Sequence, residues 1–185
     1  MSAATATTQV VPAGTWKIDP IHSHVGFAVK HMGVSTFRGQ FADYSAWLTT
    51  GEDGAPRLQG RVDVNSIAVK DENLAGHLKS ADFFDTERYP EIHFLSSAIR
   101  VGDDGELELE GDLTIKGNTR RVLAHGGVSG PHADLGGNDR IGVELASTVD
   151  RRDFGLEWNA PLPRGGFVLE NQVKLEAVLE LAREG

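Results

Sequence analysis

Three histidines near the start of the chain are the residues whose types and spacing could bind a metal ion. His22 and His24 are separated by one residue, and His31 lies further along the same segment. In a β-strand, residues two positions apart point to the same face of the sheet. Because imidazole nitrogens bind zinc, iron, nickel and copper, one hypothesis is a metal-dependent enzyme built on these three histidines.

The sequence around these histidines lacks the other ligands that such a site needs. A His-x-His site of the cupin type requires a carboxylate a few residues later, but residues 25–30 contain none. The remaining histidines have no supporting spacing; they are His77, His93, His125 and His132. We therefore predict that neither a metal nor a cofactor is bound, and that His22 and Ser23 form hydrogen bonds in a turn anchored on Asp19.

Other residues that could catalyse a reaction are few. Asp150 and Asp153 flank Arg151 and Arg152, and neighbouring arginines lower the pKa of a carboxyl group, which opposes a role as general acid. We expect these four residues to form a structural ion-pair network at the end of a strand. The chain has no cysteine, no Gly-x-Ser-x-Gly motif and no glycine-rich phosphate-binding loop. The sequence thus predicts a protein without catalytic residues.

Composition and charge limit the partners and the location of the protein. The net charge of −9 over 185 residues makes nucleic acids and anionic membrane surfaces poor partners. No segment is long and apolar enough to span a bilayer, so we expect no stable membrane insertion. Residues 1–13 lack a basic or strongly apolar signal segment, and we expect a flexible arm there and a cytoplasmic protein. Residues 14–185 are expected to form one domain.

Alternation of apolar and other residues with a period of two runs through most of the chain. It begins in residues 25–31 and recurs as far as the C-terminal segment 168–181. Residues 71–79 break the pattern, because two leucines four positions apart follow an acidic start, which predicts a short helix. About eight strands in hairpin order predict an all-β fold, a closed antiparallel barrel with one or two short helices. A filled two-sheet sandwich is the competing architecture.

The distribution of aromatic and small residues favours a cavity inside this barrel. An interior formed by eight strands can hold one small ligand. Glycines at positions such as 39, 60 and 111 lie on the same predicted strands as the aromatic residues, and small side chains inside a barrel would leave volume unfilled. Residues 80–90 include Phe83, Phe84 and Tyr89, so we expect this segment to cover an apolar opening.

Four separated motifs, in order along the chain, are similar to those of a known family. They are WKIDPIHSHVGFAVKH (residues 16–31), HLKSADFFDTERYPEIHF (77–94), LEGDLTIKGNT (109–119) and DRRDFG (150–155). Together they resemble the YceI-like, polyisoprenoid-binding family over residues 14–180.

The resemblance implies a lipocalin-like barrel of eight strands, extended at one end, that holds a long isoprenoid or similar amphiphile in an apolar channel. Eleven residues are expected to bind this ligand; they are Phe27, Val29, His31, Phe37, Arg38, Phe41, Phe84, Phe94, Leu113, Phe154 and Trp158. The polar head of the ligand would lie near the mouth, within reach of Lys30, His31 or Arg38. Some members are periplasmic and carry a signal peptide; because none is seen here, a cytoplasmic lipid carrier or an isoprenoid-quinone role is expected.

Three functions are therefore compared. The favoured one is non-enzymatic binding, storage or transport of a polyisoprenoid or fatty lipid. The alternatives are the metal-dependent enzyme and a barrel with a filled core that acts as a stress-related interaction protein. Exposed strand edges or the segment 83–89 could also support a homodimer, and nucleic acid is not expected as a partner.

Overall fold

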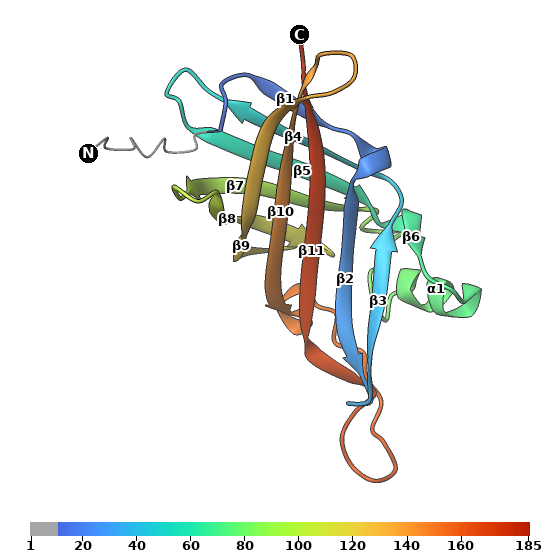
Figure 1. Ribbon diagram of the computed structural model, residues 1–185. Helices are drawn as coiled ribbons and strands as arrows, with labels where there is room; N and C mark the ends of the chain where they lie inside the picture. Colours follow the sequence, from blue (N-terminus) through green and yellow to red (C-terminus); the bar gives the residue numbers. More distant parts are fainter. Residues whose placement is uncertain (1–10) are drawn as a thin grey trace.

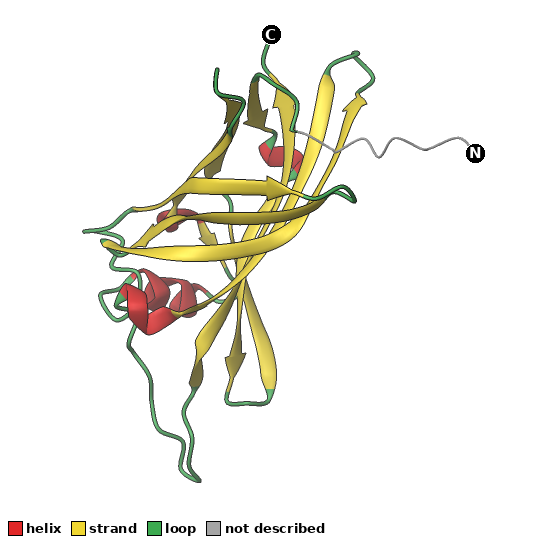
Figure 2. Ribbon diagram, turned by 90° about the vertical axis from the view of Figure 1, so that its left-hand side faces the viewer, coloured by secondary structure: helices red, strands yellow, loops and turns green. Residues whose placement is uncertain are grey.

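The computed structural model describes residues 11–185, which form a curved antiparallel sheet with one α-helix (Figures 1 and 2). Within these residues the strands are β1 (Thr15–Ile18), β2 (His24–His31), β3 (Ser35–Phe41), β4 (Tyr44–Thr50), β5 (Pro56–Asp63), β6 (Ile67–Ala68), β7 (Glu91–Val101), β8 (Glu106–Ile115), β9 (Asn118–Ala133), β10 (Asp139–Asp150) and β11 (Leu169–Arg183). The helices are α1 (Glu72–Lys79) and the short 3-10 helices η1 (Pro20–His22), η2 (Val64–Ser66) and η3 (Arg151–Phe154).

Strand pairing closes the sheet into a barrel. The strand order is β1-β4-β5-β7-β8-β9-β10-β11-β2-β3-β6, and a further pairing between β1 and β11 completes the ring. Strand β11 pairs with β1 near its C-terminal end, where Leu181 lies opposite Ile18, and with β2 before that, where Leu175 lies opposite Phe27. The predicted closed barrel is confirmed, and the filled sandwich is wrong.

Sharp bends explain how eleven short strands make a barrel of eight. Strands β1 and β2 are joined by η1, β3 and β4 by a bend at residues 42–43, and β5 and β6 by η2. The two strands on either side of a bend follow one another in the same direction and lie beside the same neighbouring course. For example, β1 pairs with β4 and β2 pairs with β3, so the course β1–β2 lies beside the course β3–β4. The strands therefore act as eight long strands, of which three are kinked.

Aspartate side chains cap the 3-10 turns at these bends. In η1, Oδ1 of Asp19 accepts a hydrogen bond from the backbone N–H of Ile21 at 3.0 Å. In η2, Oδ1 of Asp63 accepts one from Asn65 at 2.9 Å, and Oδ1 of Asp150 does the same for η3. A cap of this kind satisfies a backbone N–H that has no partner inside the turn. Each turn is thus a stable end to a strand rather than a frayed one.

The bend between β3 and β4 is held by the neighbouring turn. The Oγ atom of Ser66, in η2, accepts hydrogen bonds from the backbone N–H groups of Ala42 and Asp43 at 3.1 and 2.9 Å. The same hydroxyl donates to the carbonyl oxygen of Asp63 at 2.6 Å. One serine therefore couples two adjacent kinks, so the two strands bend at the same level.

The bends divide the interior into two apolar clusters. The upper cluster, at the end of the barrel where β1 lies in Figure 1, contains Trp16 and Leu181, both 0% exposed, with Leu109 and Ile141 at 1%. The lower cluster lies below the kinks and is rich in phenylalanines, with Phe154 at 1% exposure. The upper end is therefore a tightly filled core, and the lower end is where space for a ligand would have to be found.

The expected flexible arm and domain boundary are only partly described. Residues 1–10 lie outside the described residues. Val11 is 6% exposed and belongs to the upper cluster, and the carbonyl oxygen of Pro12 accepts a hydrogen bond from Nε1 of Trp16 at 3.1 Å. Among residues 11–185, no helix combines the length and the apolar character needed to cross a bilayer.

The predicted helix and the predicted first turn are both confirmed. Helix α1 begins after Asp71, whose Oδ1 accepts a hydrogen bond from the N–H of Leu74 at 2.8 Å. At the first turn, Nδ1 of His22 lies 2.9 Å from Oδ2 of Asp19, and Oγ of Ser23 donates to the carbonyl oxygen of Asp19 at 2.6 Å. These residues are structural, as their spacing had indicated.

An ion-pair network fixes η1 to the upper end of the barrel. The guanidinium of Arg140 contacts Oδ2 of Asp19 at 2.9 Å, Oδ2 of Asp134 at 3.0 Å and Oε1 of Glu180 at 3.1 Å. The hydrogen bond with His22, helped by that with Arg140, lowers the pKa of Asp19 to about 2. The same contact with Asp19 raises the pKa of His22 above its ordinary value.

We expect the charge of Asp19 to stabilise the fold only above strongly acidic pH. Its pKa is lower in the folded protein than the ordinary value of 3.8, so the contribution is present above that value and is lost as the pH falls through about 2. Asp19→Asn should keep the cap but show a smaller loss of stability between about pH 4 and about pH 2 than the parent protein. Urea unfolding across this range measures the difference.

The matched variant Asp19→Ala removes the cap as well as the charge. It should cost about 1–2 kcal/mol of unfolding free energy at neutral pH, whereas Asp19→Asn should cost less. Equal acid sensitivity in the parent protein and in Asp19→Asn would contradict the assigned role of the charge.

Candidate functional site

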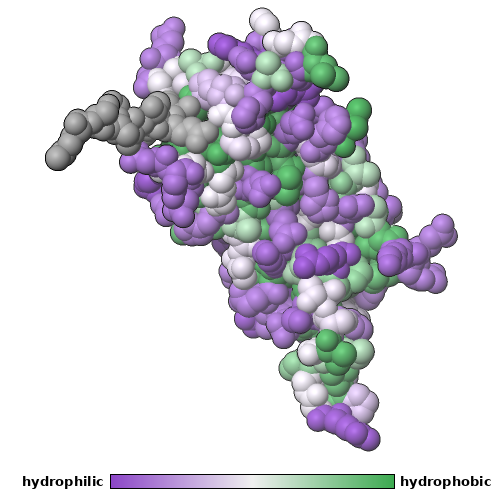
Figure 3. Space-filling view, viewed as in Figure 1, coloured by the Kyte–Doolittle hydropathy of each residue, from purple (hydrophilic) through white to green (hydrophobic). Residues whose placement is uncertain are grey.

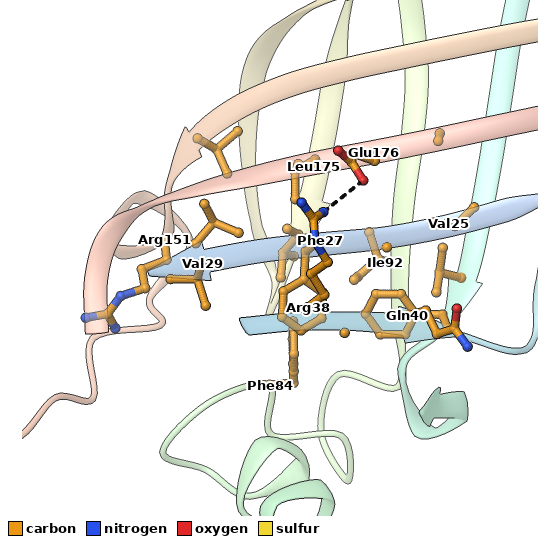
Figure 4. A pocket seen from close by; sticks show the side chains of 18 of the residues that line it. Val25, Phe27, Val29, Arg38, Gln40, Phe84, Ile92, Arg151, Leu175 and Glu176 are labelled. Atoms are coloured by element: carbon orange, nitrogen blue, oxygen red, sulfur yellow. Dashed lines mark ion pairs between the residues drawn. The ribbon is translucent and has the colours of Figure 1, made fainter. Parts of the chain in front are cut away.

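A large cavity occupies the lower half of the barrel and extends to the upper cluster, whose Ile18, Leu58 and Leu109 also line it. Its volume is about 1290 Å³, above the roughly 300–1,000 Å³ typical of small-molecule pockets. Its walls come from strands on both sides of the barrel, from α1 and from the segment after η3 (Figure 4). The favoured expectation of a cavity is therefore supported over the alternative of a barrel with a filled core.

All eleven residues predicted to bind a ligand lie along this cavity. Strand alternation accounts for most of them, because Phe27 and Val29 on β2 point to the interior together with Leu175 on β11, the cross-strand partner of Phe27. Strand β8 contributes Leu113 in the same way. That these side chains contact a ligand stays a prediction, but their common position is a property of the fold.

Arg38 differs from the other ten predicted ligand-binding residues because its charged group points away from the cavity. Its side chain is 64% exposed, and Nη1 lies 3.6 Å from Oε2 of Glu176 (Figure 4). Phe37 and Gly39, its neighbours on β3, face the interior, so Arg38 belongs to the outer face. A contact between this guanidinium and a ligand head inside the cavity would require the side chain to turn away from Glu176.

A cluster of phenylalanine rings forms one wall. The ring of Phe27 lies 6.2 Å from that of Phe37, 6.0 Å from that of Phe41 and 6.5 Å from that of Phe84, measured between ring centroids. Phe41 and Phe84 also meet edge to face at 6.2 Å. Tilted and edge-to-face contacts of this kind stabilise an aromatic cluster beyond the burial of its area. The wall is thus held in place without a ligand.

Two glycines make room for these rings, which differs from the sequence expectation. A Cβ atom on Gly39 would lie 2.5 Å from Cζ of Phe27, and one on Gly111 would lie 2.7 Å from Cε2 of Phe94. Each aromatic ring therefore lies across the glycine of a neighbouring strand. The glycines were expected to leave volume unfilled, but they receive rings instead, and the empty space lies between opposite walls.

A second aromatic group connects α1 with the segment after η3. The ring of His77 meets those of Phe83 and Trp158 edge to face, at centroid distances of 4.9 and 4.8 Å. Nε2 of His77 lies 2.9 Å from Oδ2 of Asp82. Phe83 and Phe84 are both buried against the cavity, so residues 80–89 cover the barrel as expected.

The sequence analysis missed the buried position of Arg151. Its side chain is 6% exposed and donates to the carbonyl oxygens of Glu170, Leu156 and Trp158 at 3.0, 2.7 and 2.8 Å. Nη2 also donates to Oδ1 of Asn171 at 3.2 Å. Burial lowers the pKa of this guanidinium. Arg151 therefore fastens the segment that carries Trp158 to the start of β11.

The neighbouring arginine behaves as the sequence indicated. Nη2 of Arg152 forms an ion pair with Oδ2 of Asp150 at 2.6 Å, and this hydrogen bond lowers the pKa of Asp150. Adjacent residues on a 3-10 turn point in different directions, so a pair of adjacent arginines at a strand end cannot occupy the same environment. The two adjacent arginines at a strand end were therefore the feature of the sequence that indicated a buried arginine.

The three histidines of the metal-site hypothesis, His22, His24 and His31, do not come together in the structure. Among residues 11–185, the group of three side chains that comes nearest to one is Asp19, His22 and Glu180, whose ligand atoms lie within 4.8 Å of one another. Arg140 already contacts both carboxylates of this group. His24 and His31 do not join it. The geometry therefore opposes the metal-dependent enzyme.

Comparison with known proteins gives one family. The model of the YceI-like domain matches residues 16–181. The chain is 32% identical over 169 residues to a UPF0312 protein of Staphylococcus aureus, covering 89% of this chain and 95% of the relative. It is 33% identical over 150 residues to the protein YceI of Escherichia coli O157:H7, covering 78% of each.

Solved structures share the fold. BcnA of Burkholderia cenocepacia has a TM-score of 0.72 at 23% identity, over 88% of this chain and 98% of that one. A polyisoprenoid-binding domain of Saccharophagus degradans, implicated in plant cell wall breakdown, has a TM-score of 0.70 at 16% identity, over 91% and 98%. At these identities the likeness concerns the fold alone.

We expect Arg151→Met to cost about 3 kcal/mol of unfolding free energy, because it leaves buried carbonyl groups without donors. Arg151→Lys should also be destabilising, since an ammonium group cannot reproduce the planar arrangement of donors. The matched control Arg152→Met removes a side chain that is 56% exposed and should cost at most about 1 kcal/mol. Urea unfolding measures all three; equal losses at positions 151 and 152 would contradict the role of Arg151.

Proposed function

The chain belongs to the YceI-like family, and from this membership and the cavity we propose that it is a non-enzymatic protein that binds a polyisoprenoid or a similar long-chain amphiphile. The cavity carries the proposal. It is about 1290 Å³ in volume and is lined by aromatic and branched aliphatic side chains. Binding would be driven by removal of apolar surface from water, at roughly 0.8 kcal/mol for each buried CH₂ group.

The polar end of the ligand is proposed to lie near the turn between β2 and β3. His31 and Ser35, which pair with each other across that turn, both line the cavity. Lys30 is exposed beside them. These groups can donate hydrogen bonds to a hydroxyl, phosphate or quinone oxygen. Arg38 has weaker support as a head-group contact because of its ion pair with Glu176.

Storage or transport of the ligand, an isoprenoid quinone as its identity, and a cytoplasmic location remain parts of the proposal. The name of the Saccharophagus degradans domain supports a polyisoprenoid as the class of ligand. The preformed phenylalanine wall supports binding rather than catalysis, because the groups that meet there are apolar. A homodimer is also expected, but ligand binding in the cavity does not depend on it.

We expect Leu175→Trp to weaken ligand binding at least about tenfold, because a larger side chain on the inner face of β11 would extend into the cavity beside Phe27, its neighbour on β2. Native mass spectrometry of delipidated protein with a long-chain prenol, and separately with a fatty amide, measures the bound fraction. The matched control is Val178→Trp on the outer face of the same strand, where the side chain is 41% exposed.

The two tryptophan variants separate binding from folding. Thermal unfolding should show that both remain folded, and only Leu175→Trp should lose ligand. If delipidated parent protein binds neither the prenol nor the amide, the proposed function is wrong. Equal binding by both variants would place the ligand outside this cavity.

A further inference from the structure

Two neighbouring segments form an exposed projection at the lower end of the barrel. They are the turn at residues 32–34, between β2 and β3, and the loop at residues 159–168 that precedes β11. We call them together the lower projection. The backbone N–H of Met32 donates to the carbonyl oxygen of Val168 at 2.7 Å, so the two segments are joined. In Figures 1 and 2 the loop extends well beyond the rest of the molecule.

Large apolar side chains are exposed on the lower projection. Val34 is 80% exposed, Phe167 is 62% exposed and Met32 is 44% exposed. The space-filling view shows hydrophobic residues on the protruding lower segment, with hydrophilic residues at its tip (Figure 3). Single exposed apolar residues need no explanation, but a group of them on one protruding element indicates an interaction site.

Backbone hydrogen bonds hold the loop in this shape. The N–H of Leu162 donates to the carbonyl oxygen of Gly166 at 2.9 Å, and the N–H of Val168 donates to that of Ala160 at 3.0 Å. Oδ1 of Asn159 accepts from the N–H of Leu169 at 3.0 Å. These hydrogen bonds fix the shape of the loop, and this shape keeps the side chain of Phe167 exposed and away from the barrel.

The two segments of the lower projection contain basic but no acidic residues. The protein has a net charge of −9, yet residues 20–42 and residues 158–169 contain no aspartate or glutamate, and the exposed Glu157 and Glu170 lie just outside the second range. Lys30 and Arg164 are exposed there. The acidic net charge argues against anionic surfaces for the molecule as a whole, but this end would approach such a surface with its basic residues.

The lower projection adjoins the cavity. His31 and Ser35, which flank the turn, line the cavity, and so do Val168 and Leu169 at the end of the loop. An apolar, weakly basic and protruding surface beside the opening of an apolar cavity has the features of an element that enters the interface of a bilayer.

We propose that the lower projection docks on a lipid bilayer that contains anionic lipids, and that it places the end of the cavity against the membrane. The choice of a bilayer as partner rests on the proposed lipid-binding function, whereas the exposed residues and their charge do not depend on it. A second copy of the chain fits less well. A symmetric contact through this end would bring Lys30 and Arg164 near their own copies, and a narrow loop offers little of the roughly 800 Å² per partner that stable interfaces bury.

Vesicle co-sedimentation of the full chain tests the proposal. The probes are phosphatidylcholine vesicles with and without phosphatidylglycerol. We expect the parent protein to bind better when phosphatidylglycerol is present, and the double variant Met32→Ser, Phe167→Ser to bind at least about tenfold more weakly. Arg164→Glu should weaken binding by about tenfold on the anionic vesicles alone.

Matched controls lie at the opposite end of the molecule. Leu135→Ser changes a fully exposed leucine in the loop between β9 and β10, and Arg57→Glu reverses an exposed charge at the start of β5 (Figure 1). Both should bind vesicles as the parent protein does. The proposal is overturned if the parent protein does not bind, if the projection variants bind normally, or if the controls lose as much binding as they do.

Two further measurements keep the interpretations apart. Binding of a soluble short-chain prenol should be unchanged in the projection variants; if vesicle docking persists in a protein that binds no prenol, the proposed function fails and the docking surface stands. Sedimentation equilibrium should show no self-association that depends on Phe167. A dimer that Met32→Ser, Phe167→Ser abolishes, together with no vesicle binding, would assign this surface to a second copy and overturn the proposal.

Discussion

The aspartate-capped turns that interrupt the strands are the constraint on which the rest of the structure depends. A barrel of eight uninterrupted strands has an interior that side chains can fill. Here Asp19 and Asp63 end two strands in 3-10 turns, and Ser66 holds a third bend beside them. Above the bends the strands close around Trp16; below them β2 takes over the pairing of β11 from β1. The cavity lies mainly below these bends and reaches past them to Ile18 and Leu58 of the upper cluster.

The sequence was sufficient for the course of the strands because alternation is a local property. Burial of one face requires apolar residues at every second position, and the pattern on β11 places Leu175 inward and Glu176 outward, as the structure does. The helix α1 and the turn at Asp19 were also predictable, since a capping side chain acts on the residues that follow it directly. The same alternation already places Arg38 on the outer face, opposite to Phe37 and Phe41.

The features that the sequence did not predict depend on contacts between segments that are distant in the chain. Gly39 was expected to leave space, but its neighbour across the strands is Phe27, whose ring occupies that position. Arg151 was placed in an ion-pair network at a strand end because its actual acceptors are backbone carbonyl groups, which carry no sequence signal. The histidines could be assessed more directly, since the missing carboxylate near His24 is visible in the chain itself. Interactions between residues close together in the chain were thus predictable, whereas contacts between distant residues were not.

The division into two clusters separates stability from binding. An unfilled apolar volume lacks the dispersion contacts that a close-packed core supplies, so a barrel with a cavity of about 1290 Å³ needs another source of stability. The most deeply buried residues of the upper cluster, Trp16 and Leu181 at 0% exposure, provide it together with the network around Arg140, and none of these three residues lines the cavity. A ligand that fills the lower half would restore the missing contacts and stabilise the folded state, by an amount that grows with the logarithm of the ligand concentration above its dissociation constant. Trp16, Ile141 and Leu181 do not line the cavity, so the walls formed by other residues can vary in shape while this part of the barrel stays closed.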